Sequence, residues 1–130
     1  CVREAVPLMS GGTIVAVSGF DTQRVLAGHA TLGAAKAALE TLVRYLAVEL
    51  APRGIRVNGV SPGYVETDSA RRYAGEEYET RIRAEWAAAT PLGRLGRPEE
   101  IAGVIAFLCS GDASFICGQT VVADGGRTLW

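Results

Sequence analysis

Three side chains that can take part in chemistry stand where an apolar run gives way to a helical pattern. Ser18 closes the apolar run. His29 lies in the loop that follows, and Lys36 stands near the start of the helical pattern. An imidazole can donate or accept a proton near neutral pH. The ligands of parallel α/β sheets usually bind where strands of this kind end. We therefore expect any small-molecule chemistry of this chain to take place here.

The elements that would position these side chains are a strand, a helix and a second strand. Thr13 to Val17 is a β-rich run without polar alternation, which predicts a strand covered on both faces and with neighbours on both sides. A helical pattern follows from Gly33 to Ala51, and Ile55 to Val60 is a second β-rich run. This spacing is typical of a βαβ unit with parallel strands and a right-handed crossover.

The helix from Gly33 to Ala51 has two apolar faces. One is a stripe at helical spacing, which is expected to face the core; it consists of Leu39, Leu42, Val43, Leu46, Ala47 and Leu50. The second face consists of Ala34, Ala38, Thr41, Tyr45 and Val48. Two such faces predict that the helix is covered on two sides.

The segment from Thr67 to Pro91 is polar and follows the end of the second strand. Its charged residues surround a few aromatic and aliphatic ones, which predicts short amphipathic helices. Such a segment is either a solvated helical excursion or a mobile lid above a substrate site. Its place after the carboxyl end of a strand favours the lid.

The two ends of the chain complete the predicted architecture. Residues Val2 to Met9 have a helical pattern. Pro98 and the acids after it open another helix, as the helix dipole and the missing proline N–H favour, and it ends near Ser110. Gln119 to Ala123 is a third short strand, and Asp124 to Gly126 a tight turn.

Length, charge and cysteine content set further limits. A chain of 130 residues is expected to form one domain, residues 1–130. The net charge of −1 predicts neither a nucleic acid nor an anionic membrane as partner. No apolar run reaches about 18 residues and no leader pattern opens the chain, so a cytoplasmic location is expected. Cys1, Cys109 and Cys117 lack metal-ligand spacing, and we interpret them as reduced packing residues.

Several short motifs give the chain a family resemblance. They are Lys36 with Ala37-Ala38-Leu39, Asn58-Gly-Val-Ser-Pro-Gly63, Pro91-Leu-Gly-Arg94, Gly96-Arg-Pro-Glu-Glu100, Gly118-Gln119 and Asp124-Gly-Gly126. Together, in this order, they resemble the C-terminal half of a short-chain dehydrogenase/reductase, most closely the enoyl-acyl-carrier-protein reductases and next the ketoacyl reductases. The resemblance implies an α/β, Rossmann-like fold, here a partial doubly wound parallel sheet of the last three strands with flanking helices.

The resemblance also implies an activity. It is that of an NAD(P)H-dependent oxidoreductase, with NADP or NAD as cofactor and reduction of an enoyl or 3-ketoacyl thioester in fatty acid or polyketide metabolism. The glycine-rich pyrophosphate turn of the family lies in its N-terminal half, and no G-x-G-x-x-G occurs here. Weak or no cofactor binding is therefore expected of this chain alone. The alternative is a truncated or inactive chain that acts only as a structural or assembly partner.

The catalytic residues of the family match this chain only in part. The family uses a tyrosine, a lysine and a serine for general acid catalysis and charge stabilisation. Lys36 matches the lysine. The tyrosine position four residues before it is Leu32, and the position used by the enoyl reductases, seven before, is His29. The serine position is Gly19, with Ser18 one residue away.

Other site residues are implied by the same resemblance. Asn58 would support the lysine through a water network, although an asparagine in a strand can equally bond the neighbouring backbone. The loop that contacts the nicotinamide and its phosphates in the family matches Pro62, Gly63, Val65 and Thr67. The alternative for this loop is a plain strand-ending turn. Tyr45 lies half a turn around the helix from Lys36 and is not expected to replace the missing tyrosine.

Plainer roles stay open for the first three side chains. Lys36 could be a solvated lysine, His29 a loop histidine without a role, and Ser18 a hydroxyl that satisfies a nearby backbone group. The unpaired edge expected for the strand ending at Val17, together with the second face of the long helix, predicts association. The expected partner is a second copy of the chain or a complementary N-terminal chain, besides a small-molecule or acyl-thioester substrate.

Overall fold

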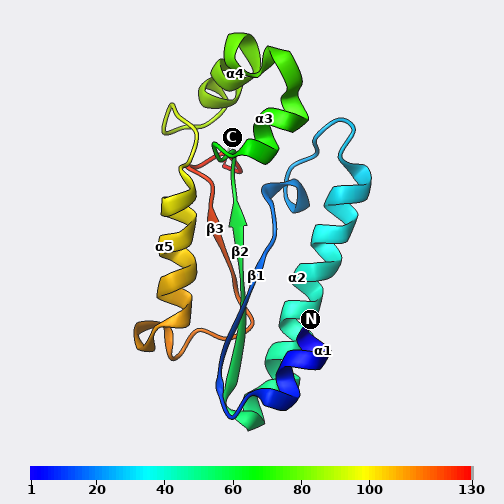
Figure 1. Ribbon diagram of the computed structural model, residues 1–130, viewed down its shortest axis with the longest axis vertical. Helices are drawn as coiled ribbons and strands as arrows, with labels where there is room; N and C mark the ends of the chain where they lie inside the picture. Colours follow the sequence, from blue (N-terminus) through cyan, green and yellow to red (C-terminus); the bar gives the residue numbers. More distant parts are fainter. Residues whose placement is uncertain (130) are drawn as a thin grey trace.

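The computed structural model describes residues 1–129 and has the predicted α/β architecture, a parallel three-stranded sheet flanked by helices (Figure 1). The strands are β1 (Gly12–Val17), β2 (Ile55–Pro62) and β3 (Thr120–Ala123). The α-helices are α1 (Val2–Ala5), α2 (Ala30–Leu50), α3 (Asp68–Ala74), α4 (Arg83–Ala88) and α5 (Pro98–Cys109). Short 3-10 helices are η1 (Val6–Leu8), η2 (Phe20–Thr22), η3 (Ala51–Arg53), η4 (Gly75–Glu77) and η6 (Gly111–Ala113), and η5 (Tyr78–Ile82) is a π-helix. No helix in this range is long and apolar enough to cross a membrane.

The sheet has the order β1-β2-β3, so that β2 is the central strand. Strands β1 and β2 run parallel with Gly12 opposite Ile55 and Val17 opposite Val60, as the βαβ spacing predicted. Within residues 1–129 β1 pairs with β2 alone, so the unpaired edge expected for this strand is confirmed and its second expected neighbour is not among these residues. The outer edge of β1 is left without a strand.

The main core lies between α2 and the sheet. Its buried members are Val43, Ala47, Leu50, Ile55 and Val57. The three from α2 follow an i, i+4, i+7 row, as predicted, with Leu39 and Leu46 half-buried beside it. The prediction for Leu42 was wrong, because its side chain is 54% exposed. Successive residues of a helix are about 100° apart, which turns Leu42 away from the sheet that Val43 faces.

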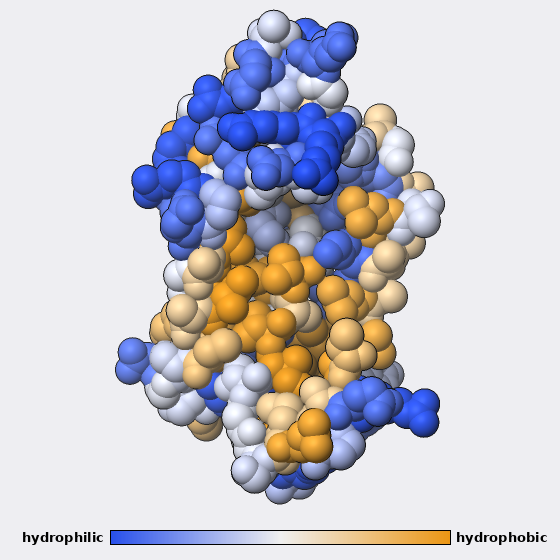
Figure 2. Space-filling model, in the orientation of Figure 1, coloured by the Kyte–Doolittle hydropathy of each residue, from blue (hydrophilic) through white to orange (hydrophobic). Residues whose placement is uncertain are grey.

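The second apolar face of α2 has no cover within the described chain. Its five residues are all exposed, including Tyr45 at 65% and Val48 at 77%. Figure 2 shows, on another part of the molecule, a broad hydrophobic surface across the middle of the view between α5 and α2, below the hydrophilic upper end. The predicted double cover of α2 therefore requires atoms from another chain segment.

The segment from Thr67 to Pro91, here called the lid segment, is helical as predicted. It forms α3, η4, η5 and α4 and occupies the upper end of the molecule beyond the carboxyl ends of the strands (Figure 1). Whether it moves as a lid stays a prediction.

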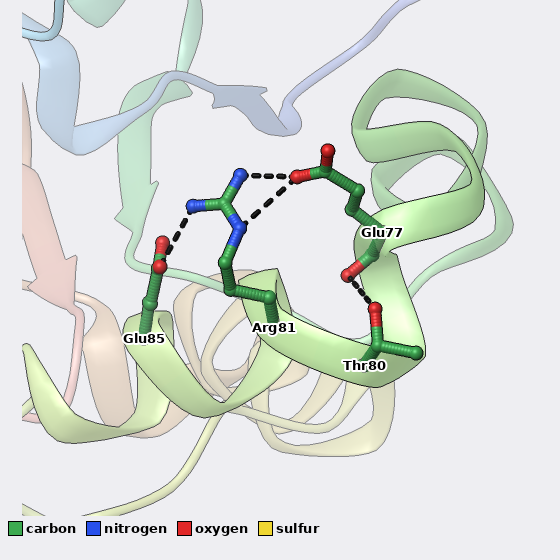
Figure 3. Close-up of polar contacts among 4 residues, drawn as sticks. All are labelled: Glu77, Thr80, Arg81 and Glu85. Carbon is green, nitrogen blue, oxygen red and sulfur yellow. Dashed lines mark hydrogen bonds and ion pairs between the residues drawn. The ribbon is translucent and has the colours of Figure 1, made fainter.

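A row of exposed ion pairs runs along the lid segment from Glu77 to Glu85 (Figure 3). The Arg81 guanidinium donates to Glu77 one turn before it and, over 2.7 Å, to Glu85 one turn after it. The side-chain hydrogen bonds to these two carboxylates raise the pKa of Arg81. Thr80 donates to the Glu77 carbonyl oxygen over 3.3 Å. Exposed pairs of this kind contribute little stability, so the row fixes the local geometry of η5 and α4 more than the fold.

The cysteines are reduced, as predicted, but they are not packing residues. Cys1, Cys109 and Cys117 are free and exposed. Cys109 directly follows Leu108, the fully buried residue of α5, and the helical step of about 100° turns its side chain toward solvent.

Helix α5 begins as the Pro98 motif predicted. Pro98 occupies the first turn, and the Glu100 carboxylate accepts a hydrogen bond from the Arg97 backbone N–H over 2.8 Å. The Arg94 guanidinium donates two further hydrogen bonds to the same carboxylate, at 2.7 and 2.8 Å. These bonds lower the pKa of Glu100 from 4.5 to about 2, and the hydrogen bonds from Arg94 have the largest effect.

We expect Glu100→Gln to flatten the acid dependence of stability. A carboxyl group whose pKa is lowered on folding stabilises the protein fully above its unfolded pKa of 4.5, and this contribution is lost as pH falls toward about 2. The drop in Tm between pH 6 and pH 2 should be smaller in Glu100→Gln than in the unsubstituted chain. Glu99→Gln, on the same helical turn, is the control and should keep the original drop. Equal drops in both variants would contradict the assignment.

Candidate functional site

A pocket of about 560 Å³ opens at the carboxyl ends of β1 and β2, beneath the lid segment. The structure brings together here all but one of the residues predicted for the site: Ser18, His29, Lys36, Pro62, Gly63, Val65 and Thr67. The exception is Asn58. Parallel strands end at the same edge of a sheet, which is why residues from both strand ends and from the start of α2 meet at one place.

Lys36 is held at the end of β1. Its Nζ donates to the carbonyl oxygen of Val17 over 2.8 Å, and α2 carries it into the pocket. The lysine is therefore anchored rather than freely solvated. An ammonium group has three donors, so this bond leaves capacity for a ligand.

Ser18 uses its hydroxyl inside the protein. Its side chain is buried, and its Oγ donates to Glu40 Oε1 over 2.6 Å. Thr22 donates to the same carboxylate oxygen over 3.0 Å. This geometry favours the plainer role of Ser18, although its partner is a carboxylate and not a backbone group. Sequence reasoning missed Glu40, which lies one helical turn after Lys36 and is therefore on the same side of α2.

His29 stands between two polar side chains. Its Nε2 lies 2.7 Å from the Tyr73 hydroxyl oxygen, and its Nδ1 lies 3.6 Å from Asp21 Oδ2. The His29 and Asp21 side chains are 20% and 8% exposed. His29 is therefore not a loop histidine without contacts. Sequence reasoning missed both partners; Tyr73 lies in α3, and only the folding of the lid segment over the pocket brings it near.

The two positions without the expected hydroxyl groups also line this pocket. Leu32 and Gly19 lie on its wall, and neither side chain offers a proton donor. Tyr45 is 65% exposed on the second face of α2 and is not among the residues that line the pocket. It does not replace the missing tyrosine.

Asn58 has a structural position instead. It is fully buried in β2, where its Nδ2 donates to the Ile116 carbonyl oxygen over 2.8 Å. Its Oδ1 accepts from the Gln119 backbone N–H over 3.0 Å. Both ends of the amide thus hold the segment that leads into β3, and Asn58 does not line the pocket. The structure matches the alternative that Asn58 bonds the neighbouring backbone. The side chain lies within β2, beside the segment that leads into β3, and not at the end of the strand where the pocket opens.

The loop after β2 is supported from behind. A Cβ atom on Gly63 would lie 2.7 Å from Asp124 Cα, so a glycine is needed for this close approach. Val65 forms an isolated parallel bridge with Gly96. Thr67 Oγ1 accepts from the Ala70 backbone N–H over 3.0 Å and caps α3. The loop is a well-anchored strand-ending turn whose other side faces the pocket, so its predicted cofactor contacts are sterically available but stay a prediction.

An aromatic wall of the pocket is formed by Phe20 of η2, Tyr64 of the loop after β2 and Trp86 of the lid segment. Tyr64 and Trp86 stack with ring centres 4.5 Å apart, and Phe20 meets Tyr64 edge to face at 4.8 Å. These three rings line the pocket. Large apolar surfaces with a few polar groups are typical of small-molecule sites. Within residues 1–129 no cluster of His, Cys, Asp and Glu is arranged to hold a metal ion.

The family model described as "Enoyl-(Acyl carrier protein) reductase" matches residues 1–128. The chain is 41% identical over 128 residues to 1-cyclohexenylcarbonyl-CoA reductase of Streptomyces collinus, covering 98% of the chain and 45% of that protein. It is 39% identical over 127 residues to 3-oxoacyl-[acyl-carrier-protein] reductase of Chlamydia pneumoniae, covering 98% of the chain and 49% of that protein.

A solved structure extends the likeness to the fold. The ligand-free aldohexose dehydrogenase of Thermoplasma acidophilum superposes with a TM-score of 0.91 at 28% identity, over 99% of this chain and 54% of that one. The chain thus spans about half the length of the proteins that it matches.

We expect Ser18→Ala to lower the free energy of unfolding by about 1–3 kcal/mol, because it removes a partner of the Glu40 carboxylate in a partly buried place. Urea denaturation measures the change. Ser114→Ala, at an exposed serine, is the control and should stay within about 0.5 kcal/mol. Similar losses in both variants would mean that the Ser18–Glu40 bond does not stabilise the fold.

Proposed function

The chain belongs to the short-chain dehydrogenase/reductase family, and we propose that it forms the substrate-binding part of an NAD(P)H-dependent oxidoreductase. One observation carries this proposal. The pocket at the carboxyl ends of β1 and β2 gathers the anchored Lys36, His29 and the loop from Pro62 to Thr67 at one place. Because the chain spans about half of its relatives, the complete activity requires further structure.

The pocket fits one end of the cofactor. Lys36, Val65 and Thr67 line it and would contact the nicotinamide end. The glycine pair Gly11-Gly12 lies elsewhere, since Gly12 pairs with Ile55 at the opposite end of the sheet. The pyrophosphate therefore needs a glycine-rich turn from outside this chain. Once bound, the nicotinamide would exchange a hydride with a substrate carbon.

The proposed substrate is an enoyl or 3-ketoacyl thioester. The description of the matching family model and the names of the two bacterial relatives support a thioester substrate. The aromatic wall of Phe20, Tyr64 and Trp86 suits the apolar part of such a molecule.

A second candidate function is a structural one. Leu32 and Gly19 leave the pocket without the hydroxyl groups that the family uses, and this observation favours a chain that assembles but does not catalyse. The two candidates differ in what a restored hydroxyl would do.

We expect Leu32→Tyr to raise carbonyl reduction in a completed protein. A suitable completed protein is a chimera in which this chain replaces the C-terminal half of the Chlamydia pneumoniae relative. Leu32 lines the pocket near Lys36, so a tyrosine there adds a hydroxyl beside the lysine, and general acid catalysis contributes at most about 10²- to 10⁴-fold. The readout is oxidation of NADPH with acetoacetyl and crotonyl thioesters.

The control for this variant is Leu8→Tyr, at a leucine that is 88% exposed in η1. It should leave the rate unchanged. A chimera that folds and binds NADPH but reduces neither thioester, with or without Leu32→Tyr, would overturn the proposed activity and leave the structural role. The unfused chain should show no saturable binding of NADPH in the low micromolar range.

Association follows from the exposed surface, and we expect the chain to be oligomeric or to bind a complementary N-terminal chain. Its accessible area is 7965 Å². A folded monomer of 13.7 kDa exposes about 6,600 Å², so the excess is on the order of 1,400 Å². A standard interface buries about 800 Å² on each partner.

Sedimentation at micromolar concentration tests this expectation. Val48→Glu, on the exposed second face of α2, should weaken self-association, because it places a charge in an apolar contact. Phe115→Glu, at a fully exposed ring after η6, is the control. A single, cooperatively unfolding species of about the monomer mass for the unsubstituted chain would contradict the expectation.

A further inference from the structure

Asp21, His29 and Tyr73 form a polar row that ends in the pocket; we call it the relay. The Asp21 carboxylate lies 3.6 Å from His29 Nδ1, and His29 Nε2 lies 2.7 Å from the Tyr73 hydroxyl oxygen. Burial decreases along the row. The Asp21 side chain is 8% exposed and the His29 side chain 20%, whereas Tyr73 is 66% exposed. All three line the pocket. A carboxylate, an imidazole and an accessible hydroxyl in this order can move a proton between the pocket and the imidazole.

The relay depends on a glycine at the position where the resemblance implied a serine. A Cβ atom on Gly19 would lie 2.8 Å from Asp21 Oδ1, closer than real Cβ contacts come. Any larger residue at 19 would therefore displace the carboxylate that faces His29. A second glycine helps, because a Cβ on Gly33 of α2 would lie 3.1 Å from the Asp21 carbonyl oxygen. The glycine that replaces the serine of the family therefore leaves the space that the Asp21 carboxylate occupies.

The second departure from the family pattern is Leu32, which stands at the tyrosine position. Leu32 has no hydroxyl, but it lines the same pocket as Tyr73 and Lys36. The lid segment brings a tyrosine hydroxyl to this pocket from α3, and His29 holds it by a hydrogen bond and by an edge-to-face ring contact at 5.2 Å. The Tyr73 phenol, the Lys36 ammonium and the aromatic wall therefore line the same pocket.

We propose that Tyr73 is the proton donor of this site and that His29 and Asp21 position and recharge it. This inference rests on the proposed oxidoreductase function. When the substrate carbonyl gains a hydride at carbon, its C=O π bond is converted to a C–O⁻ group. The Tyr73 O–H bond breaks as its proton passes to that oxygen. Imidazolium His29 returns a proton from Nε2 to the tyrosinate, and the neutral imidazole keeps its proton on Nδ1, facing Asp21. Solvent then reprotonates the imidazole.

This arrangement predicts the tautomer of the neutral histidine. The negative charge of Asp21, 3.6 Å from Nδ1, favours a proton on that nitrogen, although no hydrogen bond reaches it within residues 1–129, so Nδ1 should carry the proton and Nε2 should accept from Tyr73. His29 is the only histidine of the chain, so its two imidazole nitrogens can be assigned directly in ¹⁵N NMR spectra of the full 130-residue chain. In the neutral imidazole, the protonated nitrogen should be Nδ1. A dominant Nε2–H tautomer would overturn the relay.

Variants of Tyr73 and Asp21 test how each residue affects the ¹⁵N signals of His29. Tyr73→Phe should shift the Nε2 resonance, and Asp21→Asn should move the population toward Nε2–H. Tyr45→Phe, at an exposed tyrosine of α2, is the matched control and should change neither nitrogen. An Nε2 resonance that does not respond to Tyr73→Phe would also overturn the relay.

A glycine pair tests the dependence on residue 19. Gly19→Ala should reproduce the tautomer change of Asp21→Asn, because the added Cβ displaces the carboxylate. Gly103→Ala is the control, since a Cβ there meets no atom of the described structure within 4 Å. An unchanged tautomer in Gly19→Ala would contradict the proposed coupling.

The donor role is tested with a substrate probe, the N-acetylcysteamine thioester of acetoacetate, at millimolar concentration. Binding should perturb the Trp86 indole signal and the His29 Nε2 signal, and Tyr73→Phe should abolish only the second response. A response of Trp86 without one of His29 would overturn the donor role and leave the proposed substrate intact. No response of either would overturn the proposed thioester substrate, and with it the donor role, while the tautomer experiments would still decide whether the relay exists.

Discussion

The parallel pairing of β2 with both of its neighbours is the constraint on which the structure depends. Strand β2 is the only one within residues 1–129 that has a strand on each side. Ile55, Val57 and Val60 along it are almost completely buried. Its register with β1 sets Val17 opposite Val60, and the Ser18 N–H continues the ladder to the Val60 carbonyl oxygen over 2.7 Å. This register brings the two strand ends, and therefore the residues after them, to the same edge.

The site consists of a rigid wall and a wall contributed by the lid segment. The rigid wall follows from backbone packing: Lys36 bonds the end of β1, and Gly63 lies against the turn that begins at Asp124. The other wall consists of side chains, the Trp86 ring on Tyr64 and the Tyr73 hydroxyl on His29. The shape of the pocket is thus set by the strand ends together with contacts between the two walls. Loops carried by a rigid scaffold commonly combine these tasks.

The exposed apolar surface has the same origin as the partial site. A strand with one neighbour and a helix with one covered face are each complete only in a larger sheet or an assembly. The chain spans about half the length of the relatives that it matches, and within residues 1–129 no strand covers the outer edge of β1.

The sequence by itself determined the elements and their order, and it predicted that the residues after the first strand and at the start of the long helix would lie together. Apolar periodicity identified β1, α2 and β2, because burial of one helix face or of a whole strand leaves a repeating pattern in the chain. The family resemblance singled out Leu32, His29 and Gly19 by their distance along the chain from Lys36, and all of them line the same pocket as Lys36. Leu42 was misjudged because a pattern of apolar residues does not show how wide the buried stripe is.

Only the tertiary structure decided which groups meet. Whether Ser18 turns to a substrate or to Glu40, and whether Asn58 reaches the pocket or the connection before β3, depends on atoms far away in the chain. The contact of His29 with Tyr73 joins a loop to a helix of the lid segment, and no local pattern encodes such a pair. A local sequence pattern indicates which residues are buried, because each residue type has its own tendency to be buried. A hydrogen bond between residues far apart in the chain forms only when the folded backbone brings its donor and acceptor together.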